Sequence, residues 1–173
     1  MRYYRIVGAS LLAALSLISA TTVACKAGRG GGLEVGSLGL LPIGAVPRNM
    51  EMFVSSDCDL LLPKLSDCSA QDKEGRRYTF FDGALSKISA ANNETKKSLR
   101  LPANLKFGED IALSAKKISL ALNINLSRGT SYDGKVVYSS DFIIESSKGV
   151  LYSIELIADS YDHLSQVVER VDY

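Results

Sequence analysis

Hydrophobic and polar residues alternate most regularly in the second half of the chain. One face of the run from Val136 to Ile144 carries Val136, Tyr138, Phe142 and Ile144, whereas Ser139, Asp141 and Glu145 point the other way, which is typical of a half-buried antiparallel strand. A second run, Leu151 to Ala158, follows the turn at 146–149 and is expected to pair back onto the first. Its predicted inner face carries Tyr152, Ile154 and Leu156.

A tight hairpin is predicted in the first half of the chain. Aromatic and branched residues make strands of 77–81 and 85–89, and these flank Asp82-Gly83. That dipeptide supplies the positive φ that a short hairpin turn needs.

Helical spacing predicts three short helices, of which the middle one lies in the segment from Asp110 to Leu126. The first begins near Pro47, carries the stripe Met50, Phe53 and Val54, and ends before Cys58. The last has an i, i+3, i+4, i+7 stripe behind a cap at Ser160 or Asp162, formed by Leu164, Val167, Val168 and Val171.

The segment from Asp110 to Leu126 fits two patterns. Ile111, Ala115, Ile118 and Leu122 recur at helical spacing, yet every second residue from Ile118 onward is apolar, as in a strand. We expect a helix from about Asp110 to Lys117 or one turn beyond, with extended chain by Ile124.

Parts of the two halves resemble each other. Gly83–Ile88 matches Gly149–Ile154 at an offset of 66 residues, and the Ile43-Gly44 turn matches Phe107-Gly108 at an offset of 64. Tandem repeats at 41–90 and 105–158 are one explanation, and chance is the other. The expected fold class is α+β: an antiparallel sheet with short helices packed on one face and a C-terminal helix.

The N-terminus is predicted to be a signal peptide, residues 1–24. A basic start with Arg2 and Arg5 precedes an apolar run from Ile6 to Ile18 and a zone of small residues. A transmembrane anchor is the alternative, but the strongly apolar part is shorter than the roughly 20 residues that a span needs.

Val23-Ala24-Cys25 resembles the end of a bacterial lipoprotein signal, with Thr22 where leucine is usual. The resemblance implies lipidation of Cys25 and a lipid-anchored protein facing the periplasm. Residues 25–40 would then form a flexible tether, rich in glycine at 28–32, and 41–173 a single globular domain. Lys26, in place of aspartate directly after the cysteine, resembles the residue that sorts enteric lipoproteins to the outer membrane. Ordinary cleavage after Ala24, giving a secreted soluble protein, is the competing interpretation.

Assigning Cys25 to lipid leaves two cysteines, Cys58 and Cys68, which are predicted to form a disulfide in an oxidising compartment. The alternative is a metal or redox pair, but the spacing of nine intervening residues lacks the close pairing that such sites use.

Composition excludes several functions. The 173 residues are 46% hydrophobic and 23% charged, as in a globular domain. Losing Arg2 and Arg5 with the signal leaves 18 basic residues against 19 acidic, so nucleic-acid binding is not expected. His163 is the only histidine and no G-x-S-x-G motif is present, so we predict no catalytic residue, metal site or cofactor.

A glycine turn, a short helix and a Gly-Ala-Leu or Gly-Val-Leu hairpin recur twice between residues 41 and 158. This pattern is similar to the tandem helix-plus-meander repeat of the β-lactamase inhibitor protein family and of related small envelope lipoproteins. The resemblance implies a non-catalytic protein that presents a sheet to a protein partner, and it transfers no binding residue.

The expected function is therefore binding of an unidentified protein in the cell envelope, as an assembly accessory, inhibitor or immunity factor. Tyrosines exposed on the sheet would suit this role. The alternative is a periplasmic carrier of a lipid or small hydrophobic ligand, which needs an apolar cavity between sheet and helices.

Overall fold

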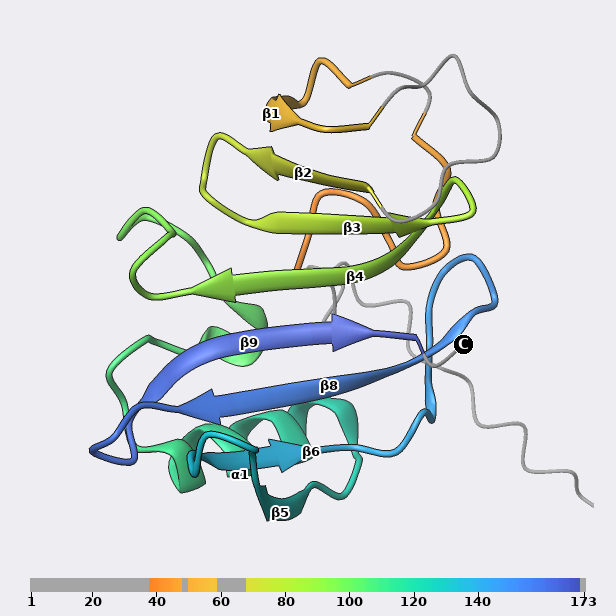
Figure 1. Cartoon of the computed structure of the whole chain (residues 1–173). Helices are drawn as coiled ribbons and strands as arrows, with labels where there is room; N and C mark the ends of the chain where they lie inside the picture. Colours follow the sequence, from red (N-terminus) through yellow and green to blue (C-terminus); the bar gives the residue numbers. More distant parts are fainter. Residues whose placement is uncertain (1–37, 48–49, 59–67, 172–173) are drawn as a thin grey trace, which may run out of the picture. The chain divides into compact units, whose positions relative to one another are not determined.

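The computed structural model describes residues 38–47, 50–58 and 68–171 (Figure 1). These ranges contain nine strands, one α-helix and one 3-10 helix. The strands are β1 (Phe53–Ser56), β2 (Cys68–Asp72), β3 (Arg77–Phe81), β4 (Ala84–Ala91), β5 (Ser127–Thr130), β6 (Val136–Ser139), β7 (Ile144–Glu145), β8 (Leu151–Ala158) and β9 (Leu164–Arg170). The helices are α1 (Ile111–Leu122) and the 3-10 turn Pro102–Asn104.

The strands form one antiparallel sheet, which confirms the predicted sheet. The strand order is β1-β2-β3-β4-β9-β8-β6-β5. The short strand β7 is not part of this order and pairs with β8. The chain therefore lays down four adjacent strands, leaves the sheet for α1, and returns from the opposite edge (Figure 1). Its last strand, β9, lies in the middle of the sheet beside β4.

The predicted hairpin turn is confirmed at Asp82 and Gly83. Their φ angles are 48° and 78°, and they join β3 to β4. The second predicted turn also contains a glycine with positive φ, Gly149, but it joins β7 to β8. The strands after the two turns hold different places in the sheet, and the internal duplication stays a prediction.

The helix α1 agrees with the helical interpretation of its segment. Asp110 caps it by accepting a hydrogen bond from the backbone N–H of Leu113 at 2.8 Å, and Asn123 ends it in the left-handed conformation. Its buried side chains are Ile111, Ser114, Ala115 and Ile118. Through this face α1 packs on β8 and β6.

Residues 38–47 cover the same face of the sheet over β3 and β4. Leu38 and Ile43 are buried in one core with Tyr78, Ile88, Ile118 and Ile154. Gly44 donates a backbone hydrogen bond to Leu85, which in turn donates to Ala45. We call the side covered by α1 and residues 38–47 the inner face, and the opposite side the outer face.

This packing corrects the predicted tether. The sequence predicts a flexible tether over 25–40, yet Leu38 is only 1% exposed. An added Cβ at Gly39 would lie 2.8 Å from Ile88 and 2.9 Å from Tyr78, so the backbone here approaches the sheet closely. The folded part of the chain therefore extends back at least to Leu38.

The predicted C-terminal helix is wrong, because this segment is strand β9. Leu164, Val167, Glu169 and Val171 are buried, and the register shifts between Ile157 and Ala158. That irregularity separates two inward residues, Leu164 and Val167, by three positions, which imitates helical spacing. The branched valines then pair across the sheet as strand residues do.

Two further element predictions need correction. The first predicted helix is strand β1, where Phe53 packs edge-on against Tyr78 and Phe80 with ring centroids 5.0 and 6.0 Å apart. The long strand at 136–144 is interrupted after Ser139, because Ser140 turns its side chain back to bond the backbone of Ile154. Of the three predicted short helices, α1 is the one present in the described residues.

Candidate functional site

The outer face is built by the residues that alternate with the buried core. In the central strands, Ile88 and Glu169 point inward, so their neighbours point outward. Strand register aligns these outward residues in two rows across the sheet. One row is Ser69, Thr79, Lys87, Arg170 and Ser153, and the next is Gln71, Arg77, Ser89, Val168, Glu155 and Ser139.

Three cations lie in these rows, and all three are exposed. Arg170 is paired with Glu155 at 2.7 Å, and Arg77 with Glu94 at 3.4 Å. Lys87 forms no ion pair with any described residue. Apart from the buried Val168, these rows are polar, and their cations lie near the centre of the sheet.

Lys87 and Arg170 are direct cross-strand partners. Directly opposite side chains interact most strongly in a sheet, and like charges in this arrangement are destabilising. Glu155, diagonal to the pair, neutralises only Arg170. Among the described residues, the positive charge of Lys87 at the junction of β4 and β9 is therefore without an acidic partner.

Behind this junction, the inner face holds the backbone N–H and carbonyl of Leu38 between two buried ionisable side chains, Glu169 and Arg76. Its N–H donates to Glu169 Oε1 at 2.9 Å, and its carbonyl accepts from Arg76 Nη1 at 3.2 Å. Tyr78 adds a third contact, because its hydroxyl accepts from the N–H of Leu40 at 3.1 Å. These bonds fix the point at which the chain enters the sheet.

Arg76 and Tyr78 are themselves organised by Asp72, which is 1% exposed. Asp72 Oδ2 accepts from Arg76 Nε at 2.6 Å and from the Tyr78 hydroxyl at 2.9 Å. Its Oδ1 accepts from the backbone N–H groups of Glu74 and Arg76. Burial raises the pKa of Tyr78. Every carboxylate oxygen in this cluster is satisfied, as a buried charge requires.

Glu169 is the exception to that rule among the described residues. It is fully buried, and Oε2 has no hydrogen-bond partner. Burial raises its pKa to about 8, while the bond from Leu38 acts in the opposite direction. Burial therefore favours the protonated form of Glu169, whose Oε1 accepts the hydrogen bond from the Leu38 N–H.

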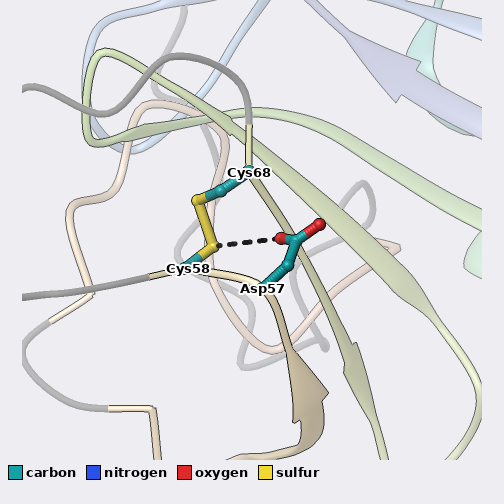
Figure 2. A group of neighbouring side chains, drawn as sticks. All are labelled: Asp57, Cys58 and Cys68. Carbon is teal, nitrogen blue, oxygen red and sulfur yellow. Dashed lines mark hydrogen bonds between the residues drawn. A yellow bond between two sulfur atoms is a disulfide. The ribbon is translucent and has the colours of Figure 1, made fainter.

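Cys58 and Cys68 are joined by a disulfide, as predicted, with an S–S distance of 2.12 Å (Figure 2). Asp57 lies beside them, and its carboxylate accepts from the backbone N–H and the hydroxyl of Ser69. The carboxylate of Asp57 and the sulfur atoms of Cys58 and Cys68 lie within 4.8 Å of one another, which is close enough for a shared metal ion. Because both sulfur atoms are in the disulfide, they are not available as thiolate ligands. The bond ties the end of β1 to the start of β2.

His163 lies in the exposed turn between β8 and β9. Asp159 Oδ1 accepts backbone hydrogen bonds from His163 at 3.0 Å and Tyr161 at 2.9 Å, and these bonds lower the pKa of Asp159. This carboxylate stabilises the turn through the backbone of His163.

In the described part of the chain, the two outward rows contain no tyrosine. Tyr78 and Tyr152 are buried on the inner face, and the strongly exposed tyrosines of the described part, Tyr132 and Tyr161, lie in turns. Sequence reasoning missed Lys87, Arg170 and Glu169. For Lys87 the signal was present, since the strand predicted at 85–89 alternates Lys87 with Ile88. Arg170 and Glu169 are missed because the C-terminal segment is predicted to be a helix, in which their alternation across a sheet cannot be recognised.

Residues 1–37 lie outside the described residues, and with them the predicted signal peptide and Cys25. The helices that are described fall short of what a membrane span requires. Comparisons with protein families, curated proteins and solved structures find no match to this chain.

Proposed function

We propose that this chain is a non-catalytic lipoprotein of the bacterial cell envelope that binds a protein partner through the outer face of its sheet. The observation that carries the proposal is the difference between the two faces. The inner face is filled by α1 and residues 38–47, whereas the outer face keeps three exposed cations among short polar side chains and the buried Val168. Charged groups at fixed positions on such a surface select a protein partner by electrostatic complementarity.

The N-terminal part of the proposal is export, cleavage after Ala24 and lipidation of Cys25, which would anchor the domain facing the periplasm, on the outer membrane if Lys26 directs sorting. The sequence at 1–25 supports it, and so does the disulfide, which belongs to an oxidising compartment. Intact-mass measurement of the mature protein tests it. We expect a chain that begins at an acylated Cys25, and a Cys25→Ser variant that lacks the acyl mass. A native product that still begins at Met1 would refute export.

Partner binding is tested by placing a photo-reactive phenylalanine analogue at Ser89, in the middle of the outer face. A matched probe at Leu120, exposed on α1, controls for nonspecific proximity. In the source cells, we expect one discrete adduct from position 89 and none of the same mass from position 120. Adducts at both positions, or at 120 alone, would contradict binding through the outer face. Native mass spectrometry that instead finds a bound lipid would favour a carrier.

A further inference from the structure

The outer face has a specific charge defect at its centre. Strand pairs usually place opposite charges across from each other, because like charges directly opposite repel. Here β4 and β9 set Lys87 opposite Arg170. Local rules of this kind are most often broken at functional positions.

In the part of the chain that the structure describes, the carboxylates around Lys87 and Arg170 compensate their charges incompletely. Glu155 reaches Arg170 and Glu94 reaches Arg77. Asp57 lies beside Ser69, at the end of the row that contains Lys87 and Arg170. Its carboxylate accepts hydrogen bonds from the backbone N–H and the hydroxyl of Ser69. Among the described residues, none of these carboxylates forms an ion pair with Lys87.

We infer that the outer face binds an acidic surface of a protein, with an aspartate or glutamate of the partner placed between Lys87 and Arg170; this rests on the proposed function. The ammonium group of Lys87 offers three N–H donors, and the guanidinium of Arg170 offers five. One nitrogen of that guanidinium, Nη2, is paired with Glu155, and the other nitrogens can still donate. An incoming carboxylate would accept from both side chains and remove their repulsion. The flanking residues Thr79 and Ser89 are short, so a partner can approach closely.

An acidic protein fits these charges better than an anionic membrane does. Recognition of anionic lipids uses clusters of roughly four to eight Lys or Arg side chains. The outer face presents three cations, and two of them are already paired with Glu155 and Glu94. Lys87, which has no ion pair among the described residues, and the partly engaged Arg170 match a small number of carboxylates at fixed positions, which folded proteins provide.

The experiment uses zero-length carbodiimide coupling in membranes that contain the full chain. This reagent joins an amine to a carboxylate only when the two are in contact, so it reports directly on Lys87. We expect an isopeptide between Lys87 and an Asp or Glu of the protein captured by the probe at Ser89. The Lys87→Arg variant should lose the isopeptide but keep the photo-adduct, because arginine retains the charge and is not coupled.

Charge reversal gives the second arm. Lys87→Glu should lower the yield of the photo-adduct about tenfold or more, whereas Lys116→Glu, on an exposed position of α1, should leave it unchanged. Lys87→Glu also removes the repulsion with Arg170, so its thermal midpoint should equal or exceed that of the original chain. That measurement separates lost binding from lost folding.

Three outcomes overturn the inference. A photo-adduct at position 89 that forms without the isopeptide and survives Lys87→Glu would refute the acidic partner and leave the proposed function standing. Absence of any adduct at position 89 would refute both. Binding to phosphatidylglycerol vesicles that depends on Lys87, with no protein adduct, would assign the cations to a lipid surface.

Discussion

Leu38 donates its backbone N–H to the carboxyl group of Glu169, a residue 131 positions later, at 2.9 Å. The bond joins the first described residue to the final strand in the middle of the sheet. Because Arg76 binds the carbonyl of Leu38 at the same time, both polar groups of this residue's backbone are satisfied inside the protein. The packing of the N-terminal segment thus depends on an acid whose ionisation is opposed by burial.

Stability is predicted to fall between pH 5 and pH 8. The pKa of Glu169 is about 8 in the folded protein, against an ordinary value of 4.5, so the folded state holds a proton that the unfolded state releases. The stabilisation is complete below pH 4.5 and is lost as the pH rises toward 8. Each pKa unit corresponds to about 1.4 kcal/mol, so unfolding by urea should show a loss of about 3–4 kcal/mol between pH 5 and pH 8.

Glu169→Gln should remove this pH dependence, because glutamine keeps an acceptor for Leu38 and has no proton to lose. Glu109→Gln is the matched control. Hydrogen bonds from Lys117 and Ser114 outweigh burial and lower the pKa of Glu109, so its contribution is lost only in acid. This control should keep the slope between pH 5 and pH 8. An equally steep slope in Glu169→Gln would show that another group is responsible.

The hydroxyl of Tyr78 is predicted to contribute measurably to stability. Tyr78→Phe removes a donor to the buried Asp72 carboxylate and an acceptor for Leu40. Loss of a hydrogen bond to a charged group costs about 1–3 kcal/mol in the free energy of unfolding. Chemical denaturation checks this, with Tyr132→Phe, in an exposed turn, as a control that should change little. Equal effects of the two variants would contradict the role of the buried network.

The alternating segments explain why part of the fold was predictable. In β8, Tyr152, Ile154 and Leu156 are buried as the pattern predicts, and the turn at Asp82-Gly83 forms because local backbone preferences decide it. Such features depend on neighbouring residues, so a single sequence is sufficient to recognise them. They gave the antiparallel sheet but not the order of its strands.

The features that were missed depend on distant contacts. The spacing of Leu164 and Val167 is ambiguous until the irregular pairing with β8 is known. Leu38 follows a glycine-rich stretch and becomes part of the core only through Glu169 and Arg76. The opposition of Lys87 and Arg170 likewise follows from register between strands that are far apart in the chain. For this reason the candidate binding face could not be located from the sequence.

The disulfide is predicted to hold β1 at the edge of the sheet. It closes a loop with nine intervening residues between Cys58 and Cys68, and it lies directly after β1, whose residues 54–56 are exposed. The chain-entropy relation gives about 2–3 kcal/mol for a loop of this size. A variant with Cys58→Ser and Cys68→Ser should lose that amount in urea unfolding. In hydrogen exchange, the amides of Ser55 and Ser56 should lose protection before those of β3.

Reduction provides the control for this prediction. Treating the original chain with dithiothreitol should reproduce the loss seen in the double serine variant, and the same treatment should leave that variant unchanged. Since the serine side chain at position 68 occupies a buried site, agreement between the two routes separates the effect of the covalent bond from the effect of the substitution. If alkylation of the native protein instead labels both Cys58 and Cys68, no bond exists there, and the edge strand must be held by its backbone pairing with β2 alone.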